Sequence, residues 1–274
     1  PGLAKTTTIN ALSRAIGLDS KRIQFTPDLL PSDIIGAQIY NPQDHSFSIK
    51  KGPLFTHLLL ADEINRAPAK VQSALLEVMQ ERQVTIADET FKLEKPFLVM
   101  ATQNPIEQEG VYALPEAQLD RFMMKIVVQH NSEIEELEIM RKAASKTFGE
   151  VEAVLNREDL FRLQDEVNKI HIDEELEHYM VQIITATRDP EKFGLENIAQ
   201  NIMFGASPRA SIDLYKAAKA KAFLRGNAFV SPADIGYVIH DILRHRIVLS
   251  YEARAKGIHT DEIISEIIET LPIP

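Results

Sequence analysis

The sequence predicts an α/β fold, a parallel sheet flanked by helices, followed by an all-helical domain. Over residues 1–130, short apolar segments alternate with amphipathic helical segments, which is the pattern of a parallel sheet. The apolar segment 57–62 ends in the carboxylates Asp62 and Glu63. Open parallel sheets bind ligands at the carboxyl ends of their strands. After residue 130, apolar residues recur at helical spacing. We therefore expect an α/β domain over 1–130 and a helical lid domain over 131–274.

The spacing of apolar residues predicts the helices and strands of the first domain. A helix is expected over 68–82, because its apolar residues recur at spacings of three and four. A further helix is expected over 5–16. Four short apolar segments predict strands over 22–25, 57–62, 97–102 and 123–129.

Two insertions interrupt this alternation. Residues 35–55 contain turn-forming residues and little regular periodicity, whereas residues 84–93 alternate around a polar turn, as a β-hairpin would. Both can be plain surface loops. In an enzyme that changes conformation, such loops are also suitable for moving a partner.

The second domain is predicted to be helical throughout. Apolar residues repeat at helical spacing over 160–170 and 176–184, and a final helix is expected over 260–271. Two more helices are expected to begin at Ser207-Pro208 and Ser231-Pro232, because a serine cap followed by proline is a helix-start signal.

Composition restricts the function classes. The net charge of −10 opposes non-specific binding to nucleic acid. The chain has no cysteine, which excludes disulfides and thiolate metal sites. We find no apolar run near membrane-spanning length and no signal-peptide pattern, so we expect a soluble, cytoplasmic protein without membrane insertion.

The opening residues resemble the second half of a phosphate-binding loop. In such a loop, backbone N–H groups curl around a phosphate at a helix N-terminus, a lysine reaches the β- and γ-oxygens, and the next hydroxyl ligates Mg²⁺. The complete motif would place its first glycine two positions before Pro1, so we expect an upstream segment with the sheet's first strand. An ordinary capped helix start is the alternative. The residues that would contact the nucleotide are Gly2, Leu3, Ala4, Lys5, Thr6 and Thr7.

The adjacent acids complete a nucleotide site. Asp62 would hold Mg²⁺ through water, together with Thr6, and Glu63 would act as general base on the attacking water. An acidic cap for the next helix is the alternative. The phosphate-loop residues followed later in the chain by the paired acids favour a nucleoside triphosphatase. Asn104, just after the strand over 97–102, can orient the lytic water, although Asn-Pro also starts turns.

The combination of motifs resembles the MoxR family of AAA+ ATPases. The resemblance rests on Pro-Gly-Leu-Ala-Lys-Thr at 1–6, Ala-Asp-Glu-Ile-Asn-Arg-Ala at 61–67, Ala-Thr-Gln-Asn-Pro at 101–105, Asp-Arg-Phe at 120–122, Gly-Ala-Ser-Pro-Arg-Ala at 205–210, and the segment 243–251. It implies a P-loop AAA+ core, with Lys5 and Thr6 as Walker A, Asp62 and Glu63 as Walker B, Asn104 as sensor 1, Arg121 as arginine finger and Arg209 as sensor 2.

Arg121 and Arg209 could also have ordinary structural roles that involve no nucleotide. A guanidinium can grip phosphate oxygens through two donors, which suits either role. Arg121 could instead form a salt bridge with Asp120 or Glu116, and neighbouring arginines can share the finger role. Arg209 could be a solvated side chain in the first turn of a helix, where a cation is unfavourable unless an anion is near. His245, between two arginines, is expected on a basic helix face and not in a metal site.

The resemblance implies a Mg²⁺-dependent ATPase that forms a homo-oligomeric ring, with six subunits in the family. It also implies a chaperone-like action on protein clients, with von Willebrand factor A domain proteins as partners. A nucleic-acid motor or loader is one alternative: Lys50 and Lys51 favour it, whereas Asp88 and Glu89 oppose it. A nucleotide-gated scaffold without turnover is another.

Overall fold

The computed structural model describes residues 5–103, 112–145 and 149–274. Contacts divide the chain into two compact units, and each contains two stretches of sequence. The first consists of Pro1–Leu114 and Val128–Leu160, and the second of Pro115–Val127 and Phe161–Pro274. The domain limits of 1–130 and 131–274 stay predictions.

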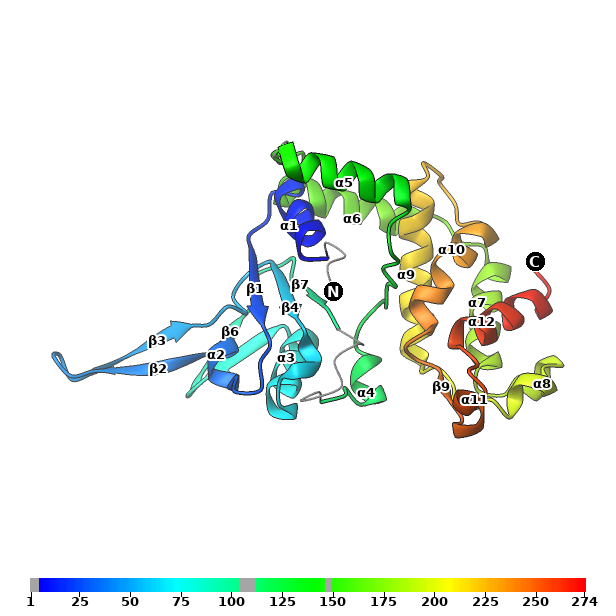
Figure 1. The fold of residues 1–274 in the computed structure, drawn as a ribbon, viewed down its shortest axis with the longest axis horizontal. Helices are drawn as coiled ribbons and strands as arrows, with labels where there is room; N and C mark the ends of the chain where they lie inside the picture. Colours follow the sequence, from blue (N-terminus) through cyan, green and yellow to red (C-terminus); the bar gives the residue numbers. More distant parts are fainter. Residues whose placement is uncertain (1–4, 104–111, 146–148) are drawn as a thin grey trace. The chain divides into compact units, whose positions relative to one another are not determined.

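The first unit contains the parallel sheet that the sequence predicts. Its three strands lie in the order β1 (Ser20–Gln24), β4 (Leu58–Asp62) and β7 (Leu98–Ala101), and all pairs are parallel. Figure 1 shows these strands side by side. The central strand β4 is buried except at its last residue, Asp62, because it has a neighbouring strand on both sides. The register pairs Gln24 with Asp62.

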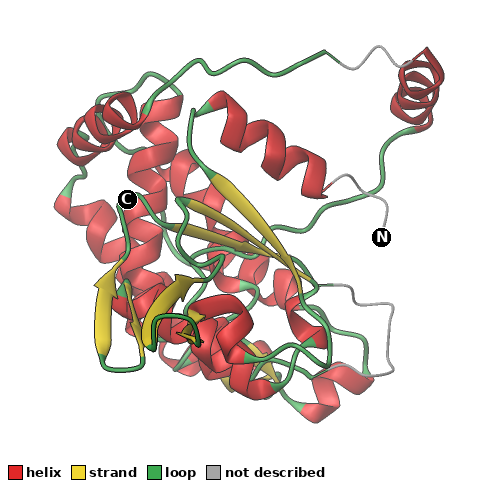
Figure 2. Cartoon of the chain, turned by 90° about the vertical axis from the view of Figure 1, so that its left-hand side faces the viewer, coloured by secondary structure: helices red, strands yellow, loops and turns green. Residues whose placement is uncertain are grey.

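Two helices of this unit match the expected ones. They are α1 (Lys5–Ala15) and α3 (Ala69–Glu81), and α3 buries the apolar stripe that its spacing predicts. Two short helices, α2 (Pro31–Ile35) and the 3₁₀ helix η1 (Ile64–Arg66), lie in connections. The longer helix α5 (Glu133–Ser145) has no buried residue. Figure 2 shows the helices in red and the strands in yellow.

The prediction of a fourth strand, over 123–129, is wrong. Its residues form no strand, and the apolar side chains of Ile126, Val127 and Val128 are exposed. A strand needs a neighbour that satisfies its backbone groups. Here the N–H of Lys125 donates instead to the carbonyl of Asp241 at 2.8 Å, and the carbonyl of Lys125 accepts from Arg244 at 2.7 Å.

Both insertions are antiparallel hairpins. The hairpin expected over 84–93 is confirmed as β5 (Gln83–Ile86) and β6 (Glu89–Lys92). The insertion over 35–55, for which the sequence shows little regular periodicity, also contains a hairpin, of β2 (Gly36–Asn41) and β3 (Ser46–Lys51). Gly36 starts β2 with φ of 112°, and a Cβ there would lie 2.3 Å from the carbonyl oxygen of Lys50. Only glycine fits that approach.

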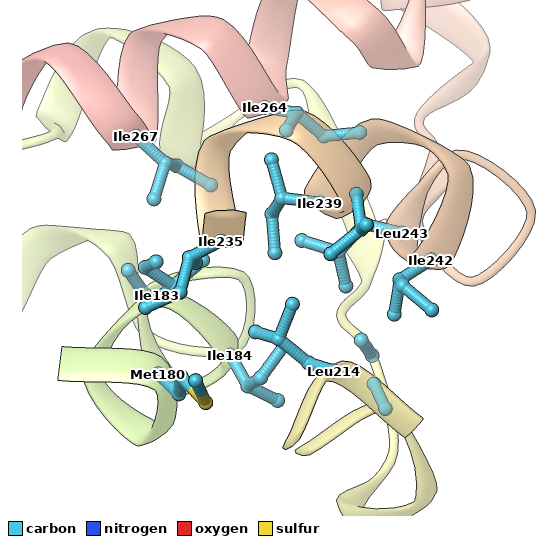
Figure 3. Packing of buried hydrophobic residues seen from close by; sticks show 14 of the residues in the cluster. Met180, Ile183, Ile184, Leu214, Ile235, Ile239, Ile242, Leu243, Ile264 and Ile267 are labelled. Atoms are coloured by element: carbon cyan, nitrogen blue, oxygen red, sulfur yellow. The ribbon is translucent and has the colours of Figure 1, made fainter. Parts of the chain in front are cut away.

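The second unit is a helical bundle around one apolar core. The long helices are α7 (Glu174–Ala186), α9 (Pro208–Leu224), α10 (Pro232–Leu243) and α12 (Thr260–Thr270). Figure 3 shows Ile184, Leu214, Ile239 and Ile264 meeting between them. The remaining elements are α4 (Glu116–Leu119), α6 (Arg157–Lys169), which begins in the first unit, η2 (Pro190–Phe193), α8 (Glu196–Ala199), α11 (Tyr251–Ala255) and a small antiparallel pair, β8 (Ile202–Phe204) with β9 (Val248–Leu249).

The two Ser-Pro helix starts are confirmed. Ser207 precedes α9 and accepts a hydrogen bond from the N–H of Arg209, and Ser231 forms a capping box with Asp234 at the start of α10. Among the described residues, none of the helices has both the length and the apolar character needed to cross a bilayer.

Candidate functional site

The start of α1 lies beside the carboxyl ends of β4 and β7. The ammonium of Lys5 donates to the carbonyl of Gln103 at 3.3 Å. The hydroxyl of Thr6 donates to Oδ2 of Asp62 at 3.5 Å. Thr7 is exposed on the same turn. Two motifs that are far apart in the sequence therefore meet at one edge of the sheet. Four predicted site residues, Gly2, Leu3, Ala4 and Asn104, lie outside the described residues.

Asp62 is held as a carboxylate by its neighbours. Its Oδ1 accepts from the hydroxyl of Thr102 at 2.5 Å, and its Oδ2 accepts from Nη2 and Nε of Arg22 at 2.7 Å and 3.1 Å. Partial burial disfavours its charge, but the hydrogen bonds from Thr102 and Arg22 and the charge of Arg22 outweigh burial and lower the pKa of Asp62. The site thus holds a fixed anion of the kind that Mg²⁺ requires.

Glu63 has a backbone conformation that turns the chain sharply out of the strand. Its φ is 56° and ψ is 49°, in the left-handed region that is uncommon for residues other than glycine. The hydroxyl of Thr102 accepts its N–H at 2.9 Å. Its carboxylate accepts from the amide of Gln24 at 2.7 Å and from Arg66 at 3.0 Å. Glu63 precedes η1, but its side chain makes no capping hydrogen bond, so a cap does not explain this acid.

The oxygen atoms of Thr6 and Asp62 suit a magnesium ion that is shared with phosphate. Mg–O distances are about 2.1 Å, so an ion ligated by the hydroxyl of Thr6 would have bound water molecules within reach of Asp62, whose carboxylate oxygen lies 3.5 Å from that hydroxyl. Within the described ranges, no group of three His, Cys, Asp or Glu side chains could hold a metal by itself. The donor set therefore fits an ion that takes its other ligands from water and a nucleotide.

Sequence reasoning missed three residues that surround these acids. Arg22 and Gln24 come from β1 and contact Asp62 and Glu63, and Thr102 follows β7 and contacts both acids. A signal was present, because residues 22 and 24 of a strand point to the same face. Using it required knowing that β1 is the neighbour of β4.

The two candidate arginines lie in the second unit. Arg209, in the first turn of α9, donates to Asp120 at 3.0 Å. A cation is unfavourable in the first turn of a helix unless an anion is near, and Asp120 is that anion. Arg121 is exposed, and among the residues that the structure describes its side chain makes no hydrogen bond or ion pair. Neither Asp120 nor Glu116 forms the salt bridge with Arg121 that the sequence allows.

The expectation that His245 lies on a basic helix face is wrong. The side chains of His245 and Arg246 are buried. Nε2 of His245 lies 2.9 Å from the carbonyl of Phe122, which requires a proton on Nε2, and its Nδ1 has no partner in the described part of the chain. Burial, together with the charge of Arg246, lowers the pKa of His245 to about 4. The neutral ring is therefore a structural donor.

Two family models match parts of the chain. Residues 1–124 match the model of the ATPase family associated with various cellular activities (AAA), and residues 195–267 match the model of the AAA lid domain. The chain is 48% identical over 274 residues to Chaperone MoxR1 of Mycobacterium tuberculosis, covering 100% of this chain and 72% of that protein. It is 32% identical to Protein MoxR of Paracoccus denitrificans over 292 residues. That match covers 100% of this chain and 85% of that protein.

A solved structure has the same fold. The crystal structure of a candidate ATPase from Cytophaga hutchinsonii superposes with a TM-score of 0.94 at 53% sequence identity. The match covers 100% of this chain and 83% of that one.

Proposed function

Since the chain belongs to the MoxR family of AAA+ ATPases, we propose that it binds Mg²⁺-ATP between its Walker motifs and uses hydrolysis to remodel protein clients. The observation that carries this proposal is the 3.5 Å approach of Thr6 to Asp62, with Glu63 directly after it. Lys5 binds the β- and γ-phosphate oxygens, and Thr6 and Asp62 hold the metal. The ion neutralises phosphate charge when it is bound.

Glu63 is the general base in this proposal. It removes a proton from a water molecule whose oxygen attacks the γ-phosphorus, while the bond between that phosphorus and the β–γ bridging oxygen breaks and ADP leaves. The hydrogen bonds from Gln24 and Arg66 support this role, because they fix the carboxylate in one orientation. Asn104 assists by orienting the same water.

Arg121 and Arg209 stabilise the negative charge that develops on the phosphate oxygens during phosphoryl transfer. Arg121 reaches the γ-phosphate bound by the neighbouring subunit of a homo-oligomeric ring, for which we propose six subunits. Its exposed, uncommitted side chain supports this role. Arg209 acts as sensor 2 on the nucleotide of its own subunit, for which it exchanges Asp120 for phosphate.

The hairpin β2–β3 is the element that we propose to contact clients. It exposes Tyr40 and Phe47, whose rings pack against each other with centroids 5.1 Å apart. Exposed aromatic side chains suit transient contact with unfolded protein segments. The relative named Chaperone MoxR1 supports a chaperone-like role. Proteins with von Willebrand factor A domains are proposed partners, and the cytoplasm is the proposed compartment.

A nucleic-acid motor remains the second candidate because of the lysines of β3. Against it, the ammonium of Lys51 lies 5.0 Å from the ring centroids of both Phe55 and Phe91, so it is engaged within the protein. Hydrolysis at low salt is therefore expected to be insensitive to single- or double-stranded nucleic acid. Stimulation by either would favour the motor.

Phosphate release by the purified oligomer tests the proposal. The Glu63→Gln variant should bind ATP and lose turnover by at least about a hundredfold, and it should retain clients in a pull-down with ATP. Glu77→Gln, an exposed glutamate on α3, is the matched control and should be unaffected. Unchanged hydrolysis in Glu63→Gln would remove Glu63 as the base. Absence of turnover in the unmodified protein would favour a nucleotide-gated scaffold.

A further inference from the structure

The fully buried side chain of Arg246 binds the backbone on both sides of Arg121. Its Nε donates to Oδ1 of Asp120 at 2.9 Å. Its Nη2 donates to the carbonyls of Phe122 at 2.8 Å and Asp120 at 3.2 Å, and its Nη1 donates to the carbonyl of Met123 at 3.1 Å. One guanidinium therefore fixes the residues before and after Arg121 in a single geometry.

The same guanidinium is anchored to two helices of the second unit. Its Nη2 donates to Asp213 of α9 at 2.5 Å, and its Nη1 donates to the carbonyl of Ile242 of α10 at 2.8 Å. The planar fork of an arginine has five N–H donors for these six acceptors, so one N–H of Nη2 is shared between two of them, whereas a lysine ammonium has three donors at one point. The contacts of Arg246 thus tie residues 120–123 to α9 and α10.

The two residues before Arg246 extend this attachment. His245 hydrogen-bonds the carbonyl of Phe122, and Arg244 donates to the carbonyl of Lys125 at 2.7 Å. Three consecutive side chains after α10 therefore hold the backbone over 120–125. The sequence singles out these residues, but the ATPase chemistry proposed above does not use them.

Arg121 lies within the held segment and has no side-chain partner among the described residues. Its backbone therefore sets the position and direction from which this side chain extends. We propose that Arg246 is a positioning residue for Arg121, and that it orients this arginine toward a neighbouring subunit's nucleotide through the backbone of residues 120–123. This inference rests on the proposed role of Arg121 in trans.

Mixed rings test the inference. Arg246→Lys alone should lower the turnover number at least about tenfold, with the KM for ATP nearly unchanged, because, among the described residues, Arg246 does not contact Lys5, Thr6 or Asp62 of the subunit's own site. Arg254→Lys, an exposed arginine on α11, is the matched control. Co-expression with Glu63→Gln subunits, which cannot hydrolyse ATP but retain a positioned Arg121, should restore turnover at the Arg246→Lys sites.

The same mixing with Arg121→Ala separates this inference from the proposed function. If rings of Arg121→Ala with Glu63→Gln regain activity and rings of Arg246→Lys with Glu63→Gln do not, Arg246 does not act through Arg121 and the inference is overturned. If neither mixture regains activity, the role of Arg121 in trans fails, and the inference fails with it. Recovery in both mixtures is the expected result.

Hydrogen exchange provides a readout that does not depend on turnover. In Arg246→Lys, amides of residues 121–125 should exchange faster than in the unmodified protein, while those of α7 and α12 stay protected. Should Arg246→Lys not assemble, Asp213→Asn, which keeps the side-chain volume but removes the negative charge that anchors Arg246, should give the same recovery and a smaller increase in local exchange. Unchanged exchange over 121–125 in both variants would contradict the inference.

Discussion

The hydroxyl of Thr6 lies 3.5 Å from a carboxylate oxygen of Asp62, although 56 positions separate them in the chain. The parallel sheet explains the approach, because it places the carboxyl end of β4 beside the start of α1. The structure thus brings together two motifs that the sequence shows as separate segments, which supports the proposed triphosphate site.

Gln24 should affect catalysis and not nucleotide affinity. Its amide donates to the carboxylate of Glu63 at 2.7 Å, so Gln24→Ala should leave the base held by Arg66 alone and lower the turnover number about tenfold. Nucleotide binding, measured by calorimetry, should stay unchanged. Gln38→Ala, an exposed glutamine of β2, is the control. A loss of ATP affinity with normal turnover would contradict this role.

The buried His245 should make stability depend on pH. Its pKa is lowered from 6.5 to about 4, so between these values the unfolded chain binds a proton that the folded chain does not. Stability is therefore lost as the pH falls from 6.5 to 4, by up to about 3 kcal/mol for this group. In His245→Gln this loss should be absent, because glutamine can still donate to Phe122 and does not titrate.

Denaturant unfolding between pH 7 and pH 4 measures the difference. His178→Gln, an exposed histidine on α7, is the control and should keep the slope of the unmodified protein. Equal slopes in His245→Gln and the unmodified protein would show that His245 titrates normally.

The helical unit should depend strongly on its apolar core. Ile184 is 1% exposed and packs between α7, α9 and α10 (Figure 3). Ile184→Ala should cost about 2–5 kcal/mol of unfolding free energy, because it removes buried methyl groups and leaves a cavity. Ile212→Ala, at a position of α9 that is 54% exposed, should cost much less. Similar losses at both positions would contradict the packing described here.

Local patterns predicted much of this structure. The strands β1, β4 and β7 and the Ser-Pro helix starts were predicted because apolar runs and caps are local signals. The hairpin β2–β3 was not predicted, because both of its faces are largely exposed and the alternation of Phe47 and Ile49 with polar residues in β3 is too short to identify a strand. The prediction of a fourth strand was wrong because residues 123–129 are mostly apolar, yet backbone groups of Met123 and Lys125 bind residues of the helical unit.

The sequence likewise predicted only some of the residues of the candidate site. The sequence motifs pointed to Lys5, Thr6, Asp62 and Glu63, whose types and order carry the signal. Arg22 and Gln24 could not be found, since their contacts depend on which strands are neighbours. The burial of Arg246 and its attachment to residues 120–123 depend on tertiary packing, which a run of basic residues does not reveal.

The most direct test of the central claim is a double-mutant cycle on the Mg²⁺-dependent affinity for ATP, using Thr6→Val, Asp62→Asn and both together. Thr8→Val, at an exposed position two residues further along α1, is the control. If Thr6 and Asp62 hold one metal ion, the double variant should lose little more affinity than Asp62→Asn alone, because neither residue binds the ion well without the other. Fully additive losses, or an affinity for ATP that does not depend on Mg²⁺, would contradict the account.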